Sequence, residues 1–458
     1  MTASSGKTVD VLIGSPQSSF WDAVTAILKG FYPYKLRKAS SVDEIFEFPA
    51  DFQPVLALID GEGGTAATNE WVQTTKMTYP DCSVIVLHSS KAPLDFTVVK
   101  KNGASEMMHL IFDREFISDM ILQLAPVEME GDQIPITSLM PVDLRDIEPG
   151  MNINFNVYIH LPSNQRSVLL RKSGDVLDEA KVDKFKNLHQ QMYIKKTEMK
   201  PFFEYSRTIM TMRNLPMPIS MTEKFHRSKK AIYEIMGQFL NASTNDYQEG
   251  KIILEKCQSI IADFEFNADR SDEELLAEIC RFTNNNRTYY HDCICFSAYG
   301  SYFAQALGWD QEKRMSAALA GLLHNIGMSQ MSFPIHDQNM AELSADQIKE
   351  FHLYPERSIN MVKAKKVALK PEVSDAIAQH RETCCRTGFP KQLDKSDMTD
   401  LGKLMSLAYR FHELTALREG HAAYSAFQAI EAICENAVSG TSEYDLLFAT
   451  QLRKKIKK

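Results

Sequence analysis

Hydrophobic positions in the first 130 residues alternate between short continuous apolar runs and segments with helical spacing. The apolar runs predict strands at Val9–Ile13, Val55–Ile59, Ser83–Leu87 and Glu106–Leu110. The helical spacing predicts helices at Phe20–Gly30, Asp95–Asn102 and Arg114–Leu124. Continuous apolar strands are buried on both faces, so helices between them indicate a doubly wound parallel α/β sheet.

The pattern changes after a proline-bearing stretch from Ala125 to Pro135, which is typical of a linker. Shorter runs then predict strands at Asn152–Leu161, Ser167–Leu170 and Met192–Lys195 and a charged helix at Asp178–His189. From about residue 219 the periodicity is helical, at 221–241, 247–264, 272–282, 288–307, 311–328, 344–364, 371–383, 398–417 and 422–437. The chain is therefore predicted to be multidomain, with an α/β domain at 1–130, a small α+β module at 136–200 and an all-α domain at 219–440.

Composition narrows the class of protein. The length of 458 residues agrees with two or three domains. A net charge of −8 argues against a protein that binds nucleic acid through its phosphates. The chain has no run of about 18 apolar residues, so no membrane span is expected. The eight cysteines are scattered without a zinc-binding spacing, which indicates reduced thiols and a cytoplasmic location.

Asp60 directly follows the predicted strand Val55–Ile59. Leu58-Ile59-Asp60-Gly61 and the order of elements resemble the receiver domain of response regulators over residues 7–125. The resemblance implies that Asp60 is the candidate phospho-acceptor, at the carboxyl end of a strand. Receivers hold Mg²⁺ with an acidic pair after the first strand, where this chain has Gly14-Ser15-Pro16. The alternative is a pseudo-receiver used for docking or dimerisation, with Asp60 as a turn or cap residue.

Three histidines are spread along the predicted helical domain, each in or beside a short motif. His324-Asn325 lies inside an apolar helical run, His291 precedes it and His380 follows it. With Tyr354-Pro355-Glu356-Arg357-Ser358 and Arg386-Thr387-Gly388-Phe389-Pro390, this order is similar to the HD-GYP family, the cyclic di-GMP phosphodiesterase branch of the HD superfamily. The resemblance covers about 219–440. The resemblance implies a helical fold. It also implies that active members of the family hold a phosphodiester on two or three metal ions bound between helices.

The resemblance assigns a position in this chain to each metal ligand of the family. Three imidazoles match and are the candidate metal ligands: His291, His324 and His380. Five positions carry another residue: Arg287 for a Glu, Asn325 for the Asp of the His-Asp pair, Tyr354 for a His, Arg381 for the second His of a pair, and Tyr409 for a late Asp. Met328 stands where a phosphate-binding Lys usually follows.

No matched position supplies a carboxylate, and carboxylates are what allow two dications to share one pocket. At an effective dielectric constant of ~20, a guanidinium ~4 Å from a dication is unfavourable by about 8 kcal/mol before screening. Arg287 and Arg381 therefore oppose a binuclear centre if they point inward. No cofactor is expected; the alternative is one transition metal (iron, manganese or zinc), because three histidines can bind zinc. Glu382 adjoins Arg381 and could assist such a site.

Gly388-Phe389-Pro390 stands where the family has a Gly-Tyr-Pro loop that is linked to ligand recognition and partner contact. Phe389 preserves stacking but lacks the phenol hydrogen bond. Arginines bind phosphates bidentately, so Arg287, Arg381 and Arg386 suggest a metal-free receptor for cyclic di-GMP or a related anion. Salt bridges to local carboxylates are the alternative. The candidate ligand contacts are Met328, Arg386, Gly388, Phe389 and Pro390.

These observations favour a cytoplasmic bacterial signalling regulator with a degenerate, non-catalytic HD-GYP domain. It would act by binding a protein partner in a signalling pathway or a nucleotide such as cyclic di-GMP. The alternative is a metal-dependent cyclic di-GMP phosphodiesterase with a reduced metal site. A homodimer stays open, as does phosphorylation at Asp60.

Overall fold

The computed structural model describes residues 9–29, 34–89, 92–127, 134, 136–142, 146–161, 166–180, 192–213, 220–242, 246–263, 276, 279, 288–332, 342–416, 423–438 and 442–456. The chain divides into two compact units. One comprises Met1–His88 and Ala92–Arg227, and the other Ser89–Lys91 and Ser228–Lys458. The three domain boundaries expected from the sequence stay a prediction.

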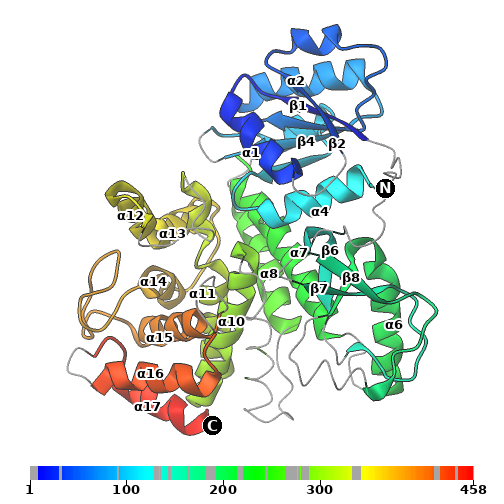
Figure 1. The fold of residues 1–458 in the computed structure, drawn as a ribbon. Helices are drawn as coiled ribbons and strands as arrows, with labels where there is room; N and C mark the ends of the chain where they lie inside the picture. The colour runs from blue at the N-terminus through cyan, green and yellow to red at the C-terminus, as the bar shows by residue number, and fades with distance from the viewer. Residues whose placement is uncertain are drawn as a thin grey trace. The chain divides into compact units, whose positions relative to one another are not determined.

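A five-stranded parallel sheet begins the first unit. Its strands are β1 (Val9–Gly14), β2 (Tyr34–Ala39), β3 (Leu56–Asp60), β4 (Ser83–His88) and β5 (Glu106–His109), in the order β2-β1-β3-β4-β5. The connections contain α1 (Ser18–Lys29), the short η1 (Asp43–Glu47), α2 (Gly64–Thr78) and α3 (Phe96–Lys101), and α4 (Arg114–Leu124) closes the fold. Figure 1 shows α2 and α4 on opposite sides of the sheet. This strand order is that of flavodoxin-like and receiver domains, so the predicted doubly wound fold is confirmed.

One strand of this sheet and one of its connecting helices were not predicted from the sequence. Strand β2 alternates basic and apolar residues, including Lys35, Arg37 and Lys38, instead of forming an apolar run. It lies at the edge of the sheet, where charged side chains are favoured because they block pairing with other chains. Helix α2 is rich in threonine, a poor helix former, which hides its periodicity.

A four-stranded antiparallel sheet follows in the same unit. Its strands are β6 (Leu139–Val142), β7 (Val157–Leu161), β8 (Arg166–Arg171) and β9 (Met192–Lys195), in the order β6-β9-β7-β8. Short 3-10 turns η3 (Ile136–Ser138) and η5 (Lys196–Glu198) flank it, and α6 (Met199–Met212) follows. Phe155, Phe202 and Tyr205 pack edge to face in its core. The α+β character is as predicted, although the strand expected from Asn152 begins at Val157, α6 was missed, and the predicted helix Asp178–His189 falls mostly outside the described residues.

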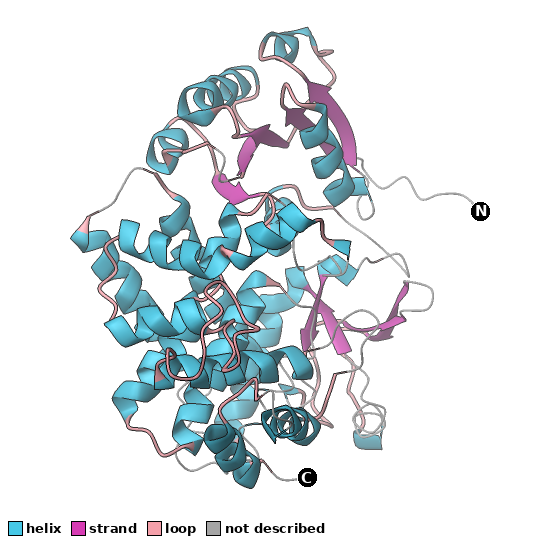
Figure 2. Cartoon of the chain, turned by 90° about the vertical axis from the view of Figure 1, so that its left-hand side faces the viewer, coloured by secondary structure: helices cyan, strands magenta, loops and turns pink. Residues whose placement is uncertain are grey.

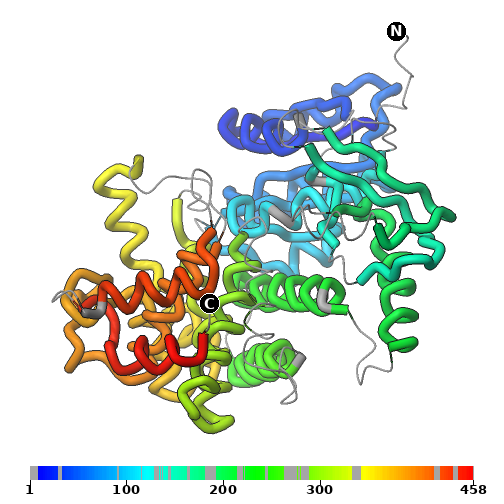
Figure 3. The backbone as a smooth tube through the Cα atoms, turned by 60° about the horizontal axis from the view of Figure 1, so that its bottom comes forward, coloured from blue at the N-terminus to red at the C-terminus, as the bar shows by residue number. Residues whose placement is uncertain are grey.

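The rest of the described chain is helical. Its elements are α7 (Met221–Leu240), α8 (Tyr247–Asp263), α10 (Tyr289–Ala306), α11 (Gln311–Leu323), η6 (Ile326–Gln330), α12 (Ala345–His352), α13 (Tyr354–Ala364), α14 (Pro371–Gln379), α15 (Asp400–Thr415), α16 (Ala426–Val438) and α17 (Leu446–Lys455). Figure 2 shows the strands in two separate groups, and Figure 3 shows α10–α17, from light green to red, gathered in one bundle. Among the described helices, none has the length and apolar character needed to cross a bilayer.

Three predicted helices are interrupted, and the interruptions shape the site. The segment 344–364 splits before α13, because Pro355 in the first turn of α13 has no N–H to continue the preceding helix. The segment 311–328 ends as an α-helix at Leu323, just before His324, and 371–383 ends at Gln379, just before His380. Both histidines thus sit where a helix stops. The predicted helix 272–282 lies mostly outside the described residues.

Candidate functional site

The three candidate metal ligands are all buried in the helical unit, each about 1% exposed. His291 lies in the first turn of α10, where its N–H donates to the capping Thr288 hydroxyl at 3.2 Å. His324 and His380 cap the C-termini of α11 and α14, and their rings lie 5.1 Å apart between centroids. The nitrogens of the His291 ring lie 3.7 and 3.9 Å from the Cys295 sulfur. The fold therefore brings the rings of His324 and His380 close together.

Hydrogen bonds occupy both ring nitrogens of His380. Its Nδ1 lies 2.6 Å from the carbonyl oxygen of Ile377, an acceptor, so the proton is assigned to Nδ1. Its Nε2 lies 2.6 Å from the hydroxyl of Tyr354, which must then be the donor. Tyr354 is fully buried at the position where the family has a histidine. The lone pair that would bind a metal is therefore already engaged.

Both paired histidines are held in the neutral form. Burial lowers the pKa of His324 to about 3, against the opposing effect of a hydrogen bond from Nδ1 to the Gly321 carbonyl at 2.7 Å. Burial and the neighbouring His324 bring the pKa of His380 well below its usual range. The His324 ring also packs edge to face on Phe296, at 4.7 Å. Neither ring can therefore supply positive charge to a phosphate.

Asn325 uses both ends of its amide inside the protein. Its Nδ2 donates to the carbonyl oxygen of Tyr289 at 3.0 Å, and its Oδ1 accepts from the thiol of Cys293 at 2.9 Å. The side chain thus fastens the start of η6 to α10. A carboxylate in this place could not donate to the Tyr289 carbonyl, so the surroundings suit an amide rather than the family's Asp.

Arg381 points into a partly enclosed aromatic cluster. Its guanidinium lies 4.3 Å from the ring centroid of Tyr409 and 4.9 Å from that of Phe389, and it bonds the Glu413 carboxylate at 3.0 Å. Burial tends to lower the pKa of Arg381, but Tyr409 and Glu413 outweigh that effect and raise it. Arg381 is therefore a fixed cation beside the histidines and is already paired with an anion.

Tyr409, at the position of the family's late Asp, packs as an aromatic ring. Its centroid lies 5.3 Å from those of Phe296 and His380 and 5.9 Å from that of His324. These edge and tilted contacts are the geometries that aromatic rings favour. The position carries packing where a metal centre would need a charged oxygen.

Glu382, which the sequence offered as a possible aid to a metal site, is engaged in hydrogen bonds within the protein. Its two carboxylate oxygens accept the backbone N–H groups of Lys391 and Leu393 at 2.5 and 3.0 Å. The Glu382 side chain is buried, and both hydrogen bonds are part-buried. Glu382 fixes the segment that carries the candidate ligand loop.

The candidate ligand loop is tightly packed at its base. A Cβ at Gly388 would lie 2.4 Å from the Glu382 Cα, so only glycine fits there. Phe389, which precedes Pro390 in a cis peptide, stacks on His352 at 4.2 Å. Two other candidate ligand contacts are accounted for within the protein: Arg386 is exposed and bonds Asp394 at 2.5 Å, and Met328 is buried in η6. Arg287 lies outside the described residues.

One buried pair was missed in the sequence. His412 Nε2 lies 3.1 Å from Asp292 Oδ1, and both side chains are almost fully buried. The pair joins α10 to α15 next to the positions of His291 and Tyr409. The sequence did place both residues near candidate positions, since Asp292 adjoins His291 and His412 follows Tyr409 by one helical turn. Neither residue matches a ligand position of the family, so the pair was not selected.

The family implies a metal at this site, and the residues present do not fit one. Within the described ranges, no group of three or more His, Cys, Asp or Glu side chains is arranged to hold a metal ion. The contacts explain this absence. The Tyr354 hydroxyl is hydrogen-bonded to His380 Nε2, the Asn325 amide is hydrogen-bonded to the Tyr289 carbonyl, and Arg381 adds a positive charge. A dication here would lack the anionic oxygens that offset its charge.

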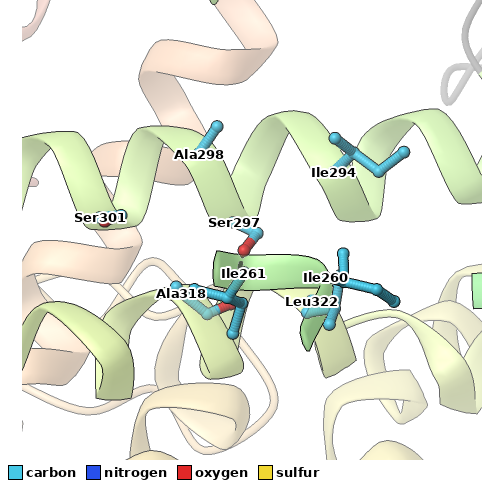
Figure 4. A pocket seen from close by; sticks show the side chains of 8 residues that line it. All are labelled: Ile260, Ile261, Ile294, Ser297, Ala298, Ser301, Ala318 and Leu322. Carbon is cyan, nitrogen blue, oxygen red and sulfur yellow. Dashed lines mark hydrogen bonds between the residues drawn. The ribbon is translucent and has the colours of Figure 1, made fainter. Parts of the chain in front are cut away.

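A small, mainly apolar pocket lies elsewhere in the same unit, between α8, α10 and α11 (Figure 4). It is lined by Ile260, Ile261, Ile294, Ser297, Ala298, Ser301, Ala318 and Leu322. The hydroxyl of Ser297 donates to the Ala318 carbonyl at 2.8 Å and so is not directed at a ligand. No candidate site residue lines this pocket.

Asp60 in the first unit is nearly buried at the carboxyl end of β3. Ser15 donates its hydroxyl to Asp60 Oδ2 at 2.5 Å, and the N–H of Glu62 donates to Oδ1 at 2.9 Å. Ser15 stands in the segment that replaces the receiver acidic pair. Both oxygens of the candidate phospho-acceptor are therefore engaged within the protein.

Comparison with known families identifies the helical region. Residues 270–445 match the family model described as HD domain. This part of the chain is an HD domain. The predicted resemblance is confirmed at that level, and the histidine cluster lies inside the HD domain. The positions predicted to carry substituted ligands, Asn325, Tyr354, Arg381 and Tyr409, also lie within the matched residues.

Two solved structures are similar to parts of the chain. Bd1817, an HDG"Y"P protein from Bdellovibrio bacteriovorus, is 19% identical, with a TM-score of 0.41, over 69% of this chain and 98% of its own. A CheY-like response regulator protein from Mesorhizobium loti is 18% identical, with a TM-score of 0.22, over 26% of this chain and 98% of its own. No curated protein matches the sequence.

Proposed function

We propose that this protein is a bacterial signalling regulator whose HD domain is of a degenerate HD-GYP type and does not hydrolyse phosphodiesters. The observation that carries the proposal is the 2.6 Å hydrogen bond between the Tyr354 hydroxyl and His380 Nε2. This hydrogen bond occupies the His380 nitrogen that would bind a metal. The hydroxyl comes from Tyr354, which stands where the family has a second histidine ligand. Hydrolysis that depends on metal-bound hydroxide has no support from such a site.

We further propose that the protein acts in the cytoplasm by binding a protein partner. Nucleotide recognition by arginines is the weaker candidate, because Arg381 is paired with Glu413 and Arg386 with Asp394. An anionic ligand such as cyclic di-GMP would have to displace those carboxylates. The loop at Gly388–Pro390 is held in place by close backbone packing at Gly388 and a part-buried hydrogen bond from Lys391 to Glu382, which supports recognition by shape.

For the receiver-like sheet we propose a docking or dimerisation role without phosphorylation. Mg²⁺ neutralises the charge that develops in phosphoryl transfer, and hard oxygen ligands hold it. Ser15 supplies a neutral hydroxyl in that region and donates it to Asp60. The carboxylate is hydrogen-bonded in the manner of a structural turn residue.

A metal and hydrolysis assay tests the main proposal. The full chain is loaded with Mn²⁺ or with Fe²⁺ under anaerobic conditions, desalted and analysed for bound metal. The same samples are incubated with cyclic di-GMP, and the nucleotides are separated by chromatography. We expect well under one equivalent of metal and intact cyclic di-GMP, with a metal-replete HD-GYP phosphodiesterase as the positive control.

The same assay can favour the alternative, a phosphodiesterase with a reduced site. The observation on its side is the 5.1 Å separation of the His324 and His380 rings. One or more tightly held metal ions together with hydrolysis of cyclic di-GMP would overturn the proposal. Titration calorimetry with cyclic di-GMP then separates the two binding hypotheses, since saturable heat without hydrolysis would indicate a nucleotide receptor.

A further inference from the structure

The substituted ligand positions of the HD domain do more than lack metal ligands. Three of those that the structure describes make a hydrogen bond to another helical element of the domain. Asn325 bonds the Tyr289 carbonyl in α10, Tyr354 in α13 bonds His380 at the end of α14, and Arg381 bonds Glu413 in α15. A metal centre would join the same elements through its ligands.

Two further buried contacts link the remaining elements. Ser358 in α13 donates its hydroxyl to the His324 carbonyl at 2.8 Å and accepts the N–H of Gly327 at 2.9 Å. It stands where the family's His-Pro-x-x-Gly motif has glycine. The Asp292–His412 pair joins α10 to α15 at 3.1 Å.

Taken in order, these contacts form a closed circuit. It runs from α10 to the α11–η6 junction, then to α13, α14 and α15, and back to α10. All of these hydrogen bonds are buried except the part-buried Arg381–Glu413 pair. Buried hydrogen bonds are costly to break, because a partner left unpaired loses its hydrogen bond without regaining water. The backbone is equally committed, since a Cβ at Gly327 would lie 2.3 Å from the Tyr354 carbonyl oxygen.

We infer that this circuit replaces metal as the cross-link of the HD domain, so that the domain holds its fold without any bound cation. The inference rests on the proposed absence of a metal centre and adds how the domain is stabilised without one. It predicts that chelators and added metals leave the folded state unaffected, because a ligand raises the unfolding temperature only if it binds the native state.

The test is thermal unfolding of the full chain with EDTA, with Mn²⁺, with Zn²⁺ and without additions. We expect the same Tm in all four conditions for the wild-type protein. Tyr354→Phe, which opens the circuit at His380, should lower the Tm equally in every condition. Tyr247→Phe, which removes a hydroxyl from a tyrosine that is 77% exposed in the same unit, should leave the Tm unchanged.

A lower wild-type Tm in EDTA, or a higher one with Mn²⁺ or Zn²⁺, would overturn the inference, as would an unchanged Tm in Tyr354→Phe. If that variant does not fold, the wild-type measurements still decide. The two proposals fail separately. Hydrolysis of cyclic di-GMP by a protein whose Tm ignores metal would end the proposed function alone, and a chelator-sensitive Tm without hydrolysis would end the circuit alone.

Discussion

Asp60 in the receiver-like sheet and His380 in the HD domain resemble each other in their surroundings. In each, a residue of the kind used for chemistry is retained and a neighbouring hydroxyl is bonded to it, Ser15 at 2.5 Å and Tyr354 at 2.6 Å. In each, the hydroxyl comes from a segment where the resemblance predicts a metal ligand. The same type of contact thus occupies two unrelated folds in one chain.

The two sites differ in charge. Asp60 offers an anionic oxygen with no acidic neighbours in the Gly14-Ser15-Pro16 segment, so a cation would have too few ligands. His380 and His324 offer neutral nitrogens with the Arg381 guanidinium nearby, so a cation would meet a repelling charge. The site at Asp60 has a negative charge but too few further ligands. The site at His324 and His380 has nitrogen ligands but no negative charge among them.

The largest expected effect comes from restoring the family's carboxylate in the HD domain. Asn325→Asp replaces the donor to the Tyr289 carbonyl with an acceptor and buries a charge. We expect the free energy of unfolding to fall by about 3 kcal/mol, measured by urea denaturation. Asn360→Asp, at an exposed position of α13, is the matched control and should change it by less than about 0.5 kcal/mol. Undiminished stability with new metal uptake in Asn325→Asp would contradict the comparison.

A second effect follows from the neutral histidines. The pKa of His324 is lower in the folded than in the unfolded state. Below about pH 6.5 the unfolded chain therefore binds more protons, and the free energy of unfolding decreases as the pH is lowered. Between pH 7 and pH 5 this histidine alone should cost about 2 kcal/mol. Denaturation of wild type and His324→Gln at both pH values isolates its share, because other titrating groups are common to the two. Equal pH dependence in both proteins would show that His324 is not held neutral.

The smallest expected effect is at Asp60. Incubation with acetyl phosphate and Mg²⁺ should leave the intact mass unchanged, because the carboxylate is bonded to Ser15 and the acidic pair is absent. Mass spectrometry of wild type beside Asp60→Asn provides the measurement. A stable gain of one phosphoryl group that disappears in the variant would separate the two sites, since only the HD domain would then be inactive.

Much of the fold could be predicted from the hydrophobic pattern. The buried strands β1, β3 and β4 were predicted to within a residue or two because they are apolar without interruption, and most of the long helices emerged from their periodicity. Elements whose signal is polar were missed, as with the basic edge strand β2 and the threonine-rich α2. Helix ends set by a side-chain contact, such as the end of α14 at His380, also escaped.

The candidate site was only half visible in the sequence. Spacing located His324 and His380, and the substitutions at Asn325 and Tyr354 argued against a metal. The partners of those substitutions come from distant segments, so no local pattern reveals that Asn325 bonds Tyr289 or that Asp292 bonds His412. The partners of Glu382, the backbone N–H groups of Lys391 and Leu393, were hidden for the same reason.

The buried carboxylate of Glu382 has a consequence for recognition. By holding the amides of Lys391 and Leu393 from inside, it sets the shape of the Gly388–Pro390 segment before any other molecule arrives. A molecule that binds this surface would therefore contact a preorganised segment. Little conformational entropy would be lost on contact, so complementarity of form would govern which molecules stay.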